Sequence, residues 1–216
     1  DIIKQETMEL KAKYGDPRRS MIVPSAGEFR VEDFYADDDM VITLSHFGYI
    51  KRTPLAEYKT QNRGGVGMKG SATRDDELIE HLYVANMHST MLFFTEQGKC
   101  FWLKVYEVPE GSRSTKGRAI QNVLSIPDDK IKAIINVPTL TDEDYINNHY
   151  IILSTKEGII KKTSLEAYSR PRAKGVNAVN VREGDELLEA ILTDGKSEVL
   201  IASRNGRCVR FDETDA

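Results

Sequence analysis

The stretch Val41-Ile-Thr-Leu-Ser-His-Phe-Gly48-Tyr-Ile-Lys-Arg52 decides the fold, because its pattern occurs four times in the chain. An apolar strand leads to a Ser or Thr, a glycine follows three residues later, and a second strand comes after the glycine. The hydroxyl can bond the turn backbone, and the glycine supplies the positive φ that a type I turn with a bulge requires. Each copy therefore predicts a tight antiparallel β-hairpin. The other copies lie at Leu92–Trp102, Ile152–Lys162 and Leu200–Arg210.

The spacing of the turn glycines indicates the architecture. Gly48, Gly98, Gly158 and Gly206 lie 50, 60 and 48 residues apart, which is the length of one propeller blade. An apolar strand precedes three of the hairpins, at 76–80, 129–133 and 185–189, and we assign each to the hairpin that follows it. A basic loop that ends in glycine follows three of the hairpins, at Gly65, Gly117 and Gly175. We predict an all-β, propeller-like pinwheel with three full blades and the start of a fourth.

The first residues differ from this repeat. Ile3, Thr7, Leu10 and Tyr14 form the stripe of a short amphipathic helix over residues 1–14. The chain starts inside the helical pattern, so we expect the helix to be the end of a longer one and the chain to be a fragment. We therefore divide the chain into a helical tail and linker at 1–20 and the pinwheel at 21–216.

Composition and charge narrow the function classes. The chain has 216 residues, 40% hydrophobic and 30% charged, with a net charge of −4, which excludes disordered and collagen-like classes. Its cations are segregated: residues 48–74 carry +5, residues 98–118 carry +3 and residues 158–182 carry +5, which leaves −17 elsewhere. Stacked blades would align these segments into one positive band, and such a band suits a polyanion such as duplex DNA, bound without regard to sequence.

Several chemistries have no support in the sequence. The four histidines show no metal-ligand spacing, and no Ser/His/Asp set is present, so we expect neither a metal site nor a catalytic residue. Cys100 and Cys208 both lie two residues after a turn glycine, so we expect two equivalent buried thiols. No apolar stretch reaches the roughly 20 residues that cross a bilayer, and we expect a cytoplasmic protein without membrane contact.

The sharpest local pattern is a glycine-rich heptapeptide in the first basic loop. Its three glycines let the backbone approach a ligand closely, while Gln61 and Arg63 offer donors to phosphate. It lacks the Gly-Lys-Ser/Thr ending of a nucleotide-binding P-loop, so ATP is not expected to bind here. The heptapeptide is Gln61-Asn62-Arg63-Gly64-Gly65-Val66-Gly67.

This heptapeptide resembles the box Gln-Arg-Arg-Gly-Gly-Lys-Gly of the C-terminal DNA-wrapping domain of the DNA gyrase A subunit. Asn62 and Val66 depart from the box, and each replaces a cation. The corresponding domain of topoisomerase IV, which has a degraded box, is the alternative within the family. The resemblance covers essentially the whole chain. Further stretches that carry it are Lys13–Arg19, Val41–Lys51, Leu82–His88 and Gly206–Phe211.

The resemblance implies a role for this chain. The domain would wrap duplex DNA and so enable a bacterial gyrase, in the cytoplasm at the nucleoid, to introduce negative supercoils. Its partners would be DNA, the rest of the A subunit in a homodimer, and the B subunit in an A2B2 assembly. ATP and Mg²⁺ would act elsewhere in that holoenzyme, and this part would cut no DNA. A protein-binding propeller is the alternative from a different class.

From the band and the resemblance together we predict the DNA-contacting residues. The heptapeptide at 61–67 is the expected anchor. Trp102 stands where three other hairpins carry a cation, so the second blade is expected to grip DNA less firmly unless Lys104 substitutes. The expected track is Lys51, Arg52, Arg113, Lys116, Arg118, Lys161, Lys162, Arg172, Lys174, Arg207 and Arg210.

Overall fold

The computed structural model describes residues 1–21, 30–58, 78–126 and 129–216. It contains two compact units, 1–33 and 34–216. The first unit holds the predicted helix, α1 (Ile2–Tyr14), all of whose residues are exposed. A short 3-10 helix, η1 (Val31–Phe34), follows where the first unit ends. The helix predicted for residues 1–14 is thus confirmed.

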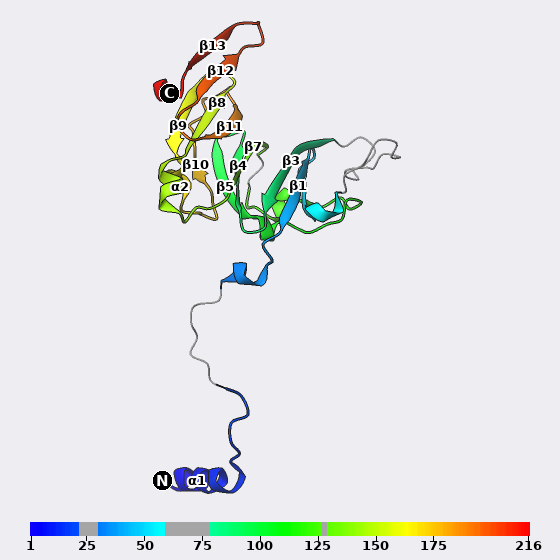
Figure 1. The fold of residues 1–216 in the computed structure, drawn as a ribbon, viewed down its shortest axis with the longest axis vertical. Coiled ribbons are helices and arrows are strands. Elements are labelled where there is room, and N and C mark those ends of the chain that lie inside the picture. Colours follow the sequence, from blue (N-terminus) through cyan, green and yellow to red (C-terminus); the bar gives the residue numbers. More distant parts are fainter. Residues whose placement is uncertain (22–29, 59–77, 127–128) are drawn as a thin grey trace. The chain divides into compact units, whose positions relative to one another are not determined.

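The second unit consists of antiparallel sheets (Figure 1), as predicted for an all-β chain. The first sheet has the order β3-β1-β2-β6 and the second β10-β5-β4-β7, while the third is β11-β8-β9 and the fourth is the hairpin β12-β13. The bounds of the strands are β1 Asp39–Ser45, β2 Tyr49–Pro54, β3 Ile79–Asn86, β4 Thr90–Thr95, β5 Lys99–Lys104, β6 Arg118–Ala119, β7 Ile131–Val137, β8 Tyr150–Thr155, β9 Ile160–Ser164, β10 Val176–Asn177, β11 Leu187–Thr193, β12 Glu198–Ala202 and β13 Cys208–Asp212.

Short helical turns follow the strands. Four of them come directly after the second strand of a hairpin: η2 (Leu55–Glu57), η3 (Val105–Glu107), η5 (Leu165–Tyr168) and η6 (Glu213–Asp215). A fifth, η4 (Ile120–Asn122), follows β6. The helix α2 (Glu143–Asn147) lies at the end of the polar insertion 137–144, where the sequence analysis did not expect it. Its signal was Asp142, whose carboxylate caps the helix by accepting from the backbone N–H of Asp144 and of Tyr145.

All four hairpin turns have the predicted chemistry. The hydroxyl of Ser45 accepts a hydrogen bond from the Tyr49 N–H at 3.1 Å, and the same bond recurs at Thr95, Thr155 and Ser203. The turn glycines have φ between +77° and +87°. Serine or threonine and glycine at this spacing therefore close each hairpin for the reason inferred from sequence.

The assignment of strands to blades corrects the sequence analysis. The strands that begin near 79, 131 and 187 do not join the hairpin that follows them. They return along the first strand of the hairpin that precedes them, so that β3 pairs with β1, β7 with β4 and β11 with β8. The strands of a repeat follow one another in the same order whichever strand is taken as the first. Only the backbone pairing therefore shows which consecutive strands form one sheet.

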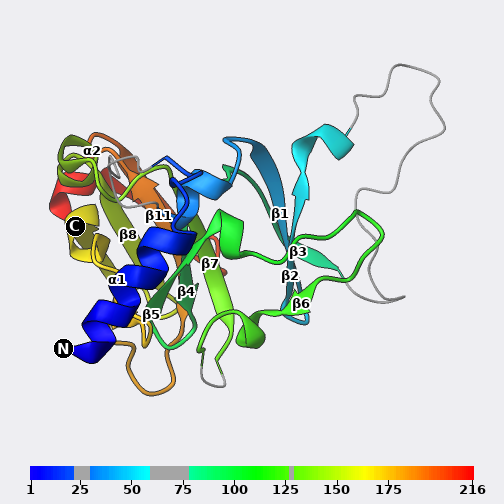
Figure 2. The same ribbon diagram turned by 90° about the horizontal axis from the view of Figure 1, so that it is seen from below.

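The sheets are interlocked at their outer edges. The edge strand β6 belongs to the chain after the second hairpin, yet it pairs with β2 of the first sheet (Figure 2). Likewise, β10 comes after the third hairpin and pairs with β5 of the second sheet. Each of these two sheets is thus completed by a strand from the next unit. The basic loops that end at Gly117 and Gly175 are the segments that make this crossing.

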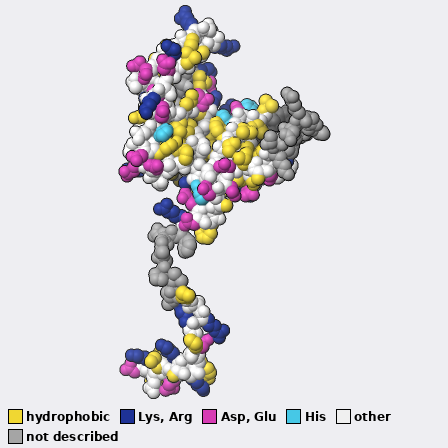
Figure 3. Space-filling model, in the orientation of Figure 1, with side chains coloured by type: hydrophobic (Ala, Val, Ile, Leu, Met, Phe, Trp, Pro, Cys, Tyr) yellow, Lys and Arg dark blue, Asp and Glu magenta, His cyan; other side chains and the backbone are white. Residues whose placement is uncertain are grey.

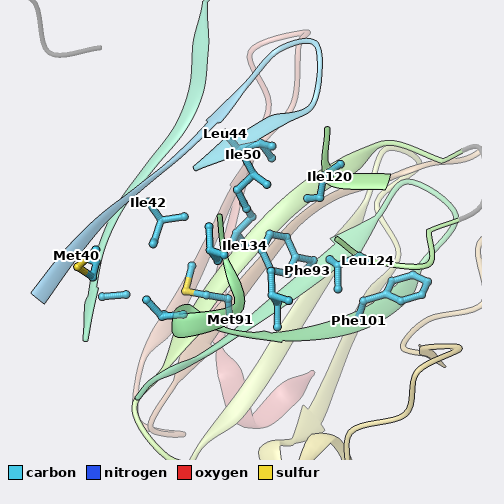
Figure 4. Close-up of a cluster of buried hydrophobic side chains, with 14 of the residues drawn as sticks. Met40, Ile42, Leu44, Ile50, Met91, Phe93, Phe101, Ile120, Leu124 and Ile134 are labelled. Carbon is cyan, nitrogen blue, oxygen red and sulfur yellow. The ribbon is translucent and has the colours of Figure 1, made fainter. Parts of the chain in front are cut away.

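Two apolar cores lie between consecutive sheets. The first, shown in Figure 4, joins side chains of β1 such as Ile42 to Met91 and Phe93 of β4. The second contains Leu92 and Phe94 of the same strand together with residues of the third sheet. Because successive side chains of a strand point to opposite faces, β4 is buried on both, which explains its uninterrupted apolar sequence.

The two cysteines are not equivalent. Cys100 is fully buried, and burial raises the pKa of its thiol. Cys208 is exposed, so the prediction of two buried thiols is wrong for this residue. The reason is the sheet that carries it: β12 and β13 pair only with each other within the part of the chain that is described. Cys100, by contrast, lies in a sheet with neighbours on both faces.

An ion-pair cluster also links the second and third sheets. Lys132 on β7 lies 3.1 Å from Glu96 and 3.0 Å from Glu186, measured from its Nζ to the carboxylate oxygens. Lys156, in the turn of the third hairpin, lies 2.9 Å from Glu186. Hydrogen bonds from Lys156 and Lys132 lower the pKa of the Glu186 carboxyl. This cluster stabilises the folded state only while Glu186 is ionised.

The turn glycines give a matched pair of stability predictions. Alanine at Gly98 or Gly158, with φ of +80° and +87°, costs about 1–2 kcal/mol for the left-handed backbone. At Gly98 the new Cβ would also meet the Val179 carbonyl and lie 2.9 Å from a methyl of Val181, whereas nothing lies within 4 Å at Gly158. We expect Gly98→Ala to lose roughly 1–3 kcal/mol more than Gly158→Ala in urea unfolding. Equal losses would contradict the packing of the second turn against residues 179–181.

The ion-pair cluster predicts a pH dependence. Because the folded pKa of Glu186 is lowered, its contribution is present above the ordinary pKa of 4.5 and disappears as pH falls through the folded value. We expect Glu186→Gln to be less stable than the parent chain at pH 7, with the difference disappearing as pH falls through the lowered folded pKa of Glu186. Thermal unfolding across this range measures the difference, with Glu183→Gln, at an exposed residue, as control. A difference that persists at low pH would mean that Glu186 acts through packing.

Candidate nucleic-acid interface

Two basic loops lie at equivalent places in consecutive sheets. The loop at 109–117 leads into β6 and the loop at 169–175 leads into β10. The strand after each loop does not pair with the hairpin that the loop follows. It pairs with the second strand of the hairpin one unit earlier, β6 with β2 and β10 with β5. The loops therefore occupy the same edge of two neighbouring sheets. This is the arrangement that a continuous basic rim requires.

The cations of these loops face solvent to different degrees. Arg118, Arg172 and Lys174 are exposed, as is Arg170, which the predicted track did not include. Arg113 is 28% exposed, lies 3.9 Å from the Glu57 carboxylate and packs over the Tyr58 ring. The exposed side chains remain available to a polyanion.

A neighbouring aromatic ring orients one further loop cation. The ammonium of Lys116 lies 3.6 Å from the centre of the Tyr49 ring, at the start of β2. A cation held over an aromatic face is attracted by the ring's negative charge density. Lys116 is only partly exposed, so a ligand would reach it at the edge of the first sheet.

Lys51 does not face solvent. Its side chain is buried beneath the loop of the next unit, where the ammonium donates to the backbone carbonyls of Ser112, Arg113 and Thr115 at 3.1, 3.2 and 2.6 Å. Burial lowers the pKa of Lys51, and Glu57 partly opposes this. An ammonium group has three hydrogens, and all three are used here. Lys51 therefore shapes the basic loop from below.

Arg52 is also committed to the protein. Its guanidinium donates to the carbonyls of Tyr106 and Val108, the second at 2.9 Å, and pairs with Glu110 at 2.9 Å. Only 9% of its side chain is exposed. The prediction that Lys51 and Arg52 contact DNA is therefore not compatible with their burial, and we assign both to the junction between the first and second blades.

Of the two corresponding cations in the third hairpin, Lys162 also bonds within the protein and is mostly buried. Lys162 donates to the Glu213 carbonyl at 3.0 Å, lies 3.5 Å from the carboxylate of the same residue, and is 13% exposed. It therefore joins Lys51 and Arg52 as a residue of the blade junctions. Lys161 is exposed, although its ammonium donates to the Ala178 carbonyl at 2.6 Å.

Trp102 holds the position in the second hairpin that Arg52 holds in the first, and it makes a similar contact without a positive charge. Its indole N–H donates to the Tyr168 carbonyl at 2.8 Å, so it reaches the next blade as Arg52 does. Arg52 and Lys162, which hold the same position in the first and third hairpins, are likewise turned into the protein, whereas Arg210 in the fourth hairpin is exposed. The burial of Arg52 and Lys162 thus gives no support to the expected weaker grip at the second blade, which stays a prediction.

The fourth hairpin presents exposed cations. Arg207 and Arg210 are exposed, and Arg210 lies 3.6 Å from the Glu198 carboxylate across the sheet. Arg204, at the turn, is exposed as well and was not among the predicted residues. Figure 3 shows basic side chains at the tip of this hairpin. Counting every cation near a turn glycine, instead of only those on the second strand, would have found Arg204.

The glycine-rich heptapeptide at 61–67 lies outside the described residues, so the predicted anchor stays a prediction. Within the described part of the chain, no helix has the length and apolar character needed to cross a membrane. No group of three or more His, Cys, Asp or Glu side chains in the same part could hold a metal ion.

Comparison with known proteins places the chain in a family. The model of the DNA gyrase C-terminal domain, a β-propeller, matches residues 39–86, 89–138, 149–194 and 197–215. The first three of these segments each hold a hairpin with the strand that returns along it, and the last holds the fourth hairpin. The chain belongs to the DNA gyrase C-terminal domain family. The resemblance noted in the sequence, and the propeller-like fold expected from it, are confirmed.

Relatives agree with this family. The chain is 44% identical over 216 residues to the DNA gyrase A protein of Halalkalibacterium halodurans, and 41% identical over 214 residues to that of Haemophilus influenzae. The two alignments cover 100% and 99% of this chain but only 25% and 24% of those proteins. The chain thus spans about a quarter of the length of the curated relatives it matches.

Two solved structures have a similar fold. The C-terminal domain of a DNA topoisomerase IV superposes with a TM-score of 0.66 and 27% identity, covering 83% of this chain and 53% of that one. A DNA gyrase A C-terminal domain superposes with a TM-score of 0.63 and 23% identity, covering 82% of this chain and 56% of that one. The second likeness shows the fold alone.

Lys51 gives a direct test of the junction. We expect Lys51→Met to lower the free energy of unfolding by roughly 2–4 kcal/mol, because three loop carbonyls lose a charged donor in a buried place. Lys196→Met, at an exposed lysine, should change stability by less than about 0.5 kcal/mol. Urea unfolding measures both. A Lys51→Met chain as stable as the parent would show that the carbonyls find water instead.

Proposed function

We propose that this chain binds duplex DNA without regard to sequence and bends it along the rim of basic loops. The observation that carries the proposal is the equivalent placement of loops 109–117 and 169–175 on neighbouring sheets. The first loop holds two partly exposed cations and leads into the exposed Arg118, and the second holds three exposed cations. A row of cations that follows successive blades suits a charged rod better than a compact ligand. Backbone phosphates supply such a row, and contacts to them carry no sequence information.

The energetics require many contacts. Bending a few tens of base pairs costs on the order of several kcal/mol. Each phosphate neutralised by lysine or arginine releases condensed counterions, which favours binding at low salt. A single blade offers only a few exposed cations, so contacts along several blades must together offset the bending cost. The repeated arrangement of the loops supports this requirement.

The structure changes which residues we propose for these contacts. Lys51, Arg52 and Lys162 are omitted, because their charged groups are enclosed by the protein. Arg170 and Arg204 are added, because they are exposed and lie in the same parts of the repeat. The proposed anchor remains Gln61, Asn62, Arg63, Gly64, Gly65, Val66 and Gly67. The proposed track is Arg113, Lys116, Arg118, Lys161, Arg170, Arg172, Lys174, Arg204, Arg207 and Arg210.

The relatives suggest the setting in which this binding is used. They are DNA gyrase A subunits, so we propose that the chain is the DNA-wrapping part of a gyrase and lets it introduce negative supercoils. The rest of the A subunit, the B subunit in an A2B2 assembly, ATP and Mg²⁺ would act outside this chain, in the bacterial cytoplasm. This chain itself would not cleave DNA.

A topoisomerase IV domain is the second candidate. Its support is the TM-score of 0.66 and the two positions of the heptapeptide, Asn62 and Val66, that lack a cation. Sequence identity above 40% to gyrase A subunits over the whole chain favours gyrase. A protein-binding propeller is the outcome that remains if DNA does not bind.

Salt titration tests the proposal. We expect the chain to bind unrelated duplexes with similar affinity, and log affinity to fall linearly with log salt. The double variant Arg172→Glu, Lys174→Glu should bind more weakly, with a slope smaller by about 0.9 for each phosphate that is no longer neutralised.

The control for this titration is Lys196→Glu, a charge reversal at an exposed residue outside the basic loops, and it should leave affinity and slope unchanged. Melting temperatures of all variants should match the parent chain, because the altered side chains are exposed. Absence of binding at low salt, or equal weakening by the control, would count against the rim.

A further inference from the structure

We infer that, in the first three hairpins, the fourth residue after the turn glycine is a clasp that fixes the orientation of the next blade and thereby the course of the rim of basic loops. The first clasp is Arg52, whose guanidinium on β2 donates to the Val108 carbonyl at 2.9 Å, at the end of η3. The link from this clasp to DNA rests on the proposed function. The clasp itself rests on contacts within the protein.

The second clasp has a different side chain in the same place. Trp102 is the fourth residue after Gly98, as Arg52 is after Gly48. Its indole N–H donates to the Tyr168 carbonyl at 2.8 Å. Tyr168 is the tenth residue after its own turn glycine, and so is Val108. Two chemically different donors thus reach the equivalent carbonyl of the following blade.

The third clasp ends on the same helical turn of the next blade. Lys162 is the fourth residue after Gly158, and its ammonium donates to the Glu213 carbonyl at 3.0 Å. Glu213 opens η6 and is fully buried, and its carboxylate also accepts from the Thr193 hydroxyl at 2.8 Å. The three clasp residues share a long side chain with an N–H donor at its end. Positive charge is not the shared property, because an indole carries none.

A clasp of this kind supplies what the apolar cores lack. Burial of apolar area between sheets is favourable but has little directional preference. A hydrogen bond from a buried or half-buried donor requires a defined distance and angle, and breaking it leaves a polar group unpaired. The clasp therefore favours one rotation of each blade on its neighbour.

The position of the acceptors connects the clasp to the rim. Val108 directly precedes the loop 109–117, and Tyr168 directly precedes the loop 169–175. Fixing these carbonyls fixes the point where each basic loop leaves its blade. The angle between successive loops, and with it the bend imposed on DNA, then depends on the clasps.

Substitutions at Trp102 separate the clasp from packing. Trp102→Phe removes the donor and keeps an aromatic ring, while Trp102→Arg removes the ring and restores a donor of the kind found in the first hairpin. Trp102 packs against the second apolar core, where phenylalanine is the better replacement. Packing alone therefore predicts that Trp102→Phe is the milder change, and the clasp predicts the opposite. Lys162→Met and Lys162→Arg repeat the test at the third clasp.

Two measurements on the whole chain give the result. Hydrogen exchange without DNA should be about tenfold faster at 169–176 in Trp102→Phe and near the parent rate in Trp102→Arg. The linking-number change that the bound chain leaves in nicked and religated plasmid should be smaller in Trp102→Phe and restored in Trp102→Arg. Affinity for a short duplex should stay within about twofold of the parent for both, because the loop cations are unchanged.

Each other outcome is informative. Unchanged exchange in Trp102→Phe, or faster exchange in Trp102→Arg than in Trp102→Phe, would overturn the clasp. If hydrogen exchange changes as expected but the linking-number change in Trp102→Phe is undiminished, the proposed influence of the clasp on the path of the DNA would be overturned. Absence of any linking-number change with the parent chain would refute the proposed wrapping, while the exchange result would still decide the clasp.

Discussion

The pairing of the outer edge of the first and second sheets with a strand from the next unit is the constraint on which the rest of the structure depends. An open edge strand leaves backbone N–H and C=O groups unpaired. In the first two sheets, β6 and β10 meet this need from the following blade. Neighbouring blades are therefore joined by backbone hydrogen bonds as well as by apolar cores, and the segments that make the crossing are the basic loops.

This constraint gives the cations two separate tasks. Lys51 and Arg52, on the second strand of the first hairpin, lie under the crossing segment and donate hydrogen bonds to its backbone carbonyls. Those near the crossing strand and on the loop itself, such as Arg118 and Arg172, stay exposed. Some of the many lysines and arginines thus stabilise the junctions between blades, and others remain on the surface. The exposed cations, which also include Lys161 and Arg210 on the later hairpins, are the ones that we propose attract DNA.

The two tasks depend on each other. A basic loop can hold its charges at a defined place only if its ends are fixed, and both ends are fixed by the neighbouring blade. One end is the edge strand, and the other is the helical turn whose carbonyl accepts from Arg52 or Trp102. Rigid placement of charge is what would turn simple attraction of DNA into a bend of defined direction.

The sequence alone determined the four hairpins and the first helix, and the tertiary structure determined which strands pair with them. Gly48 and Ser45 predict a turn because the causes, positive φ and a local hydroxyl bond, act within five residues. The pairing of β3, the burial of Lys51 and the exposure of Cys208 depend instead on segments far along the chain. A lysine is the same letter in the sequence whether its ammonium meets solvent or three carbonyls. Whether the ammonium is buried depends on the segment that crosses over the lysine, and the position of that segment is known only from the folded chain.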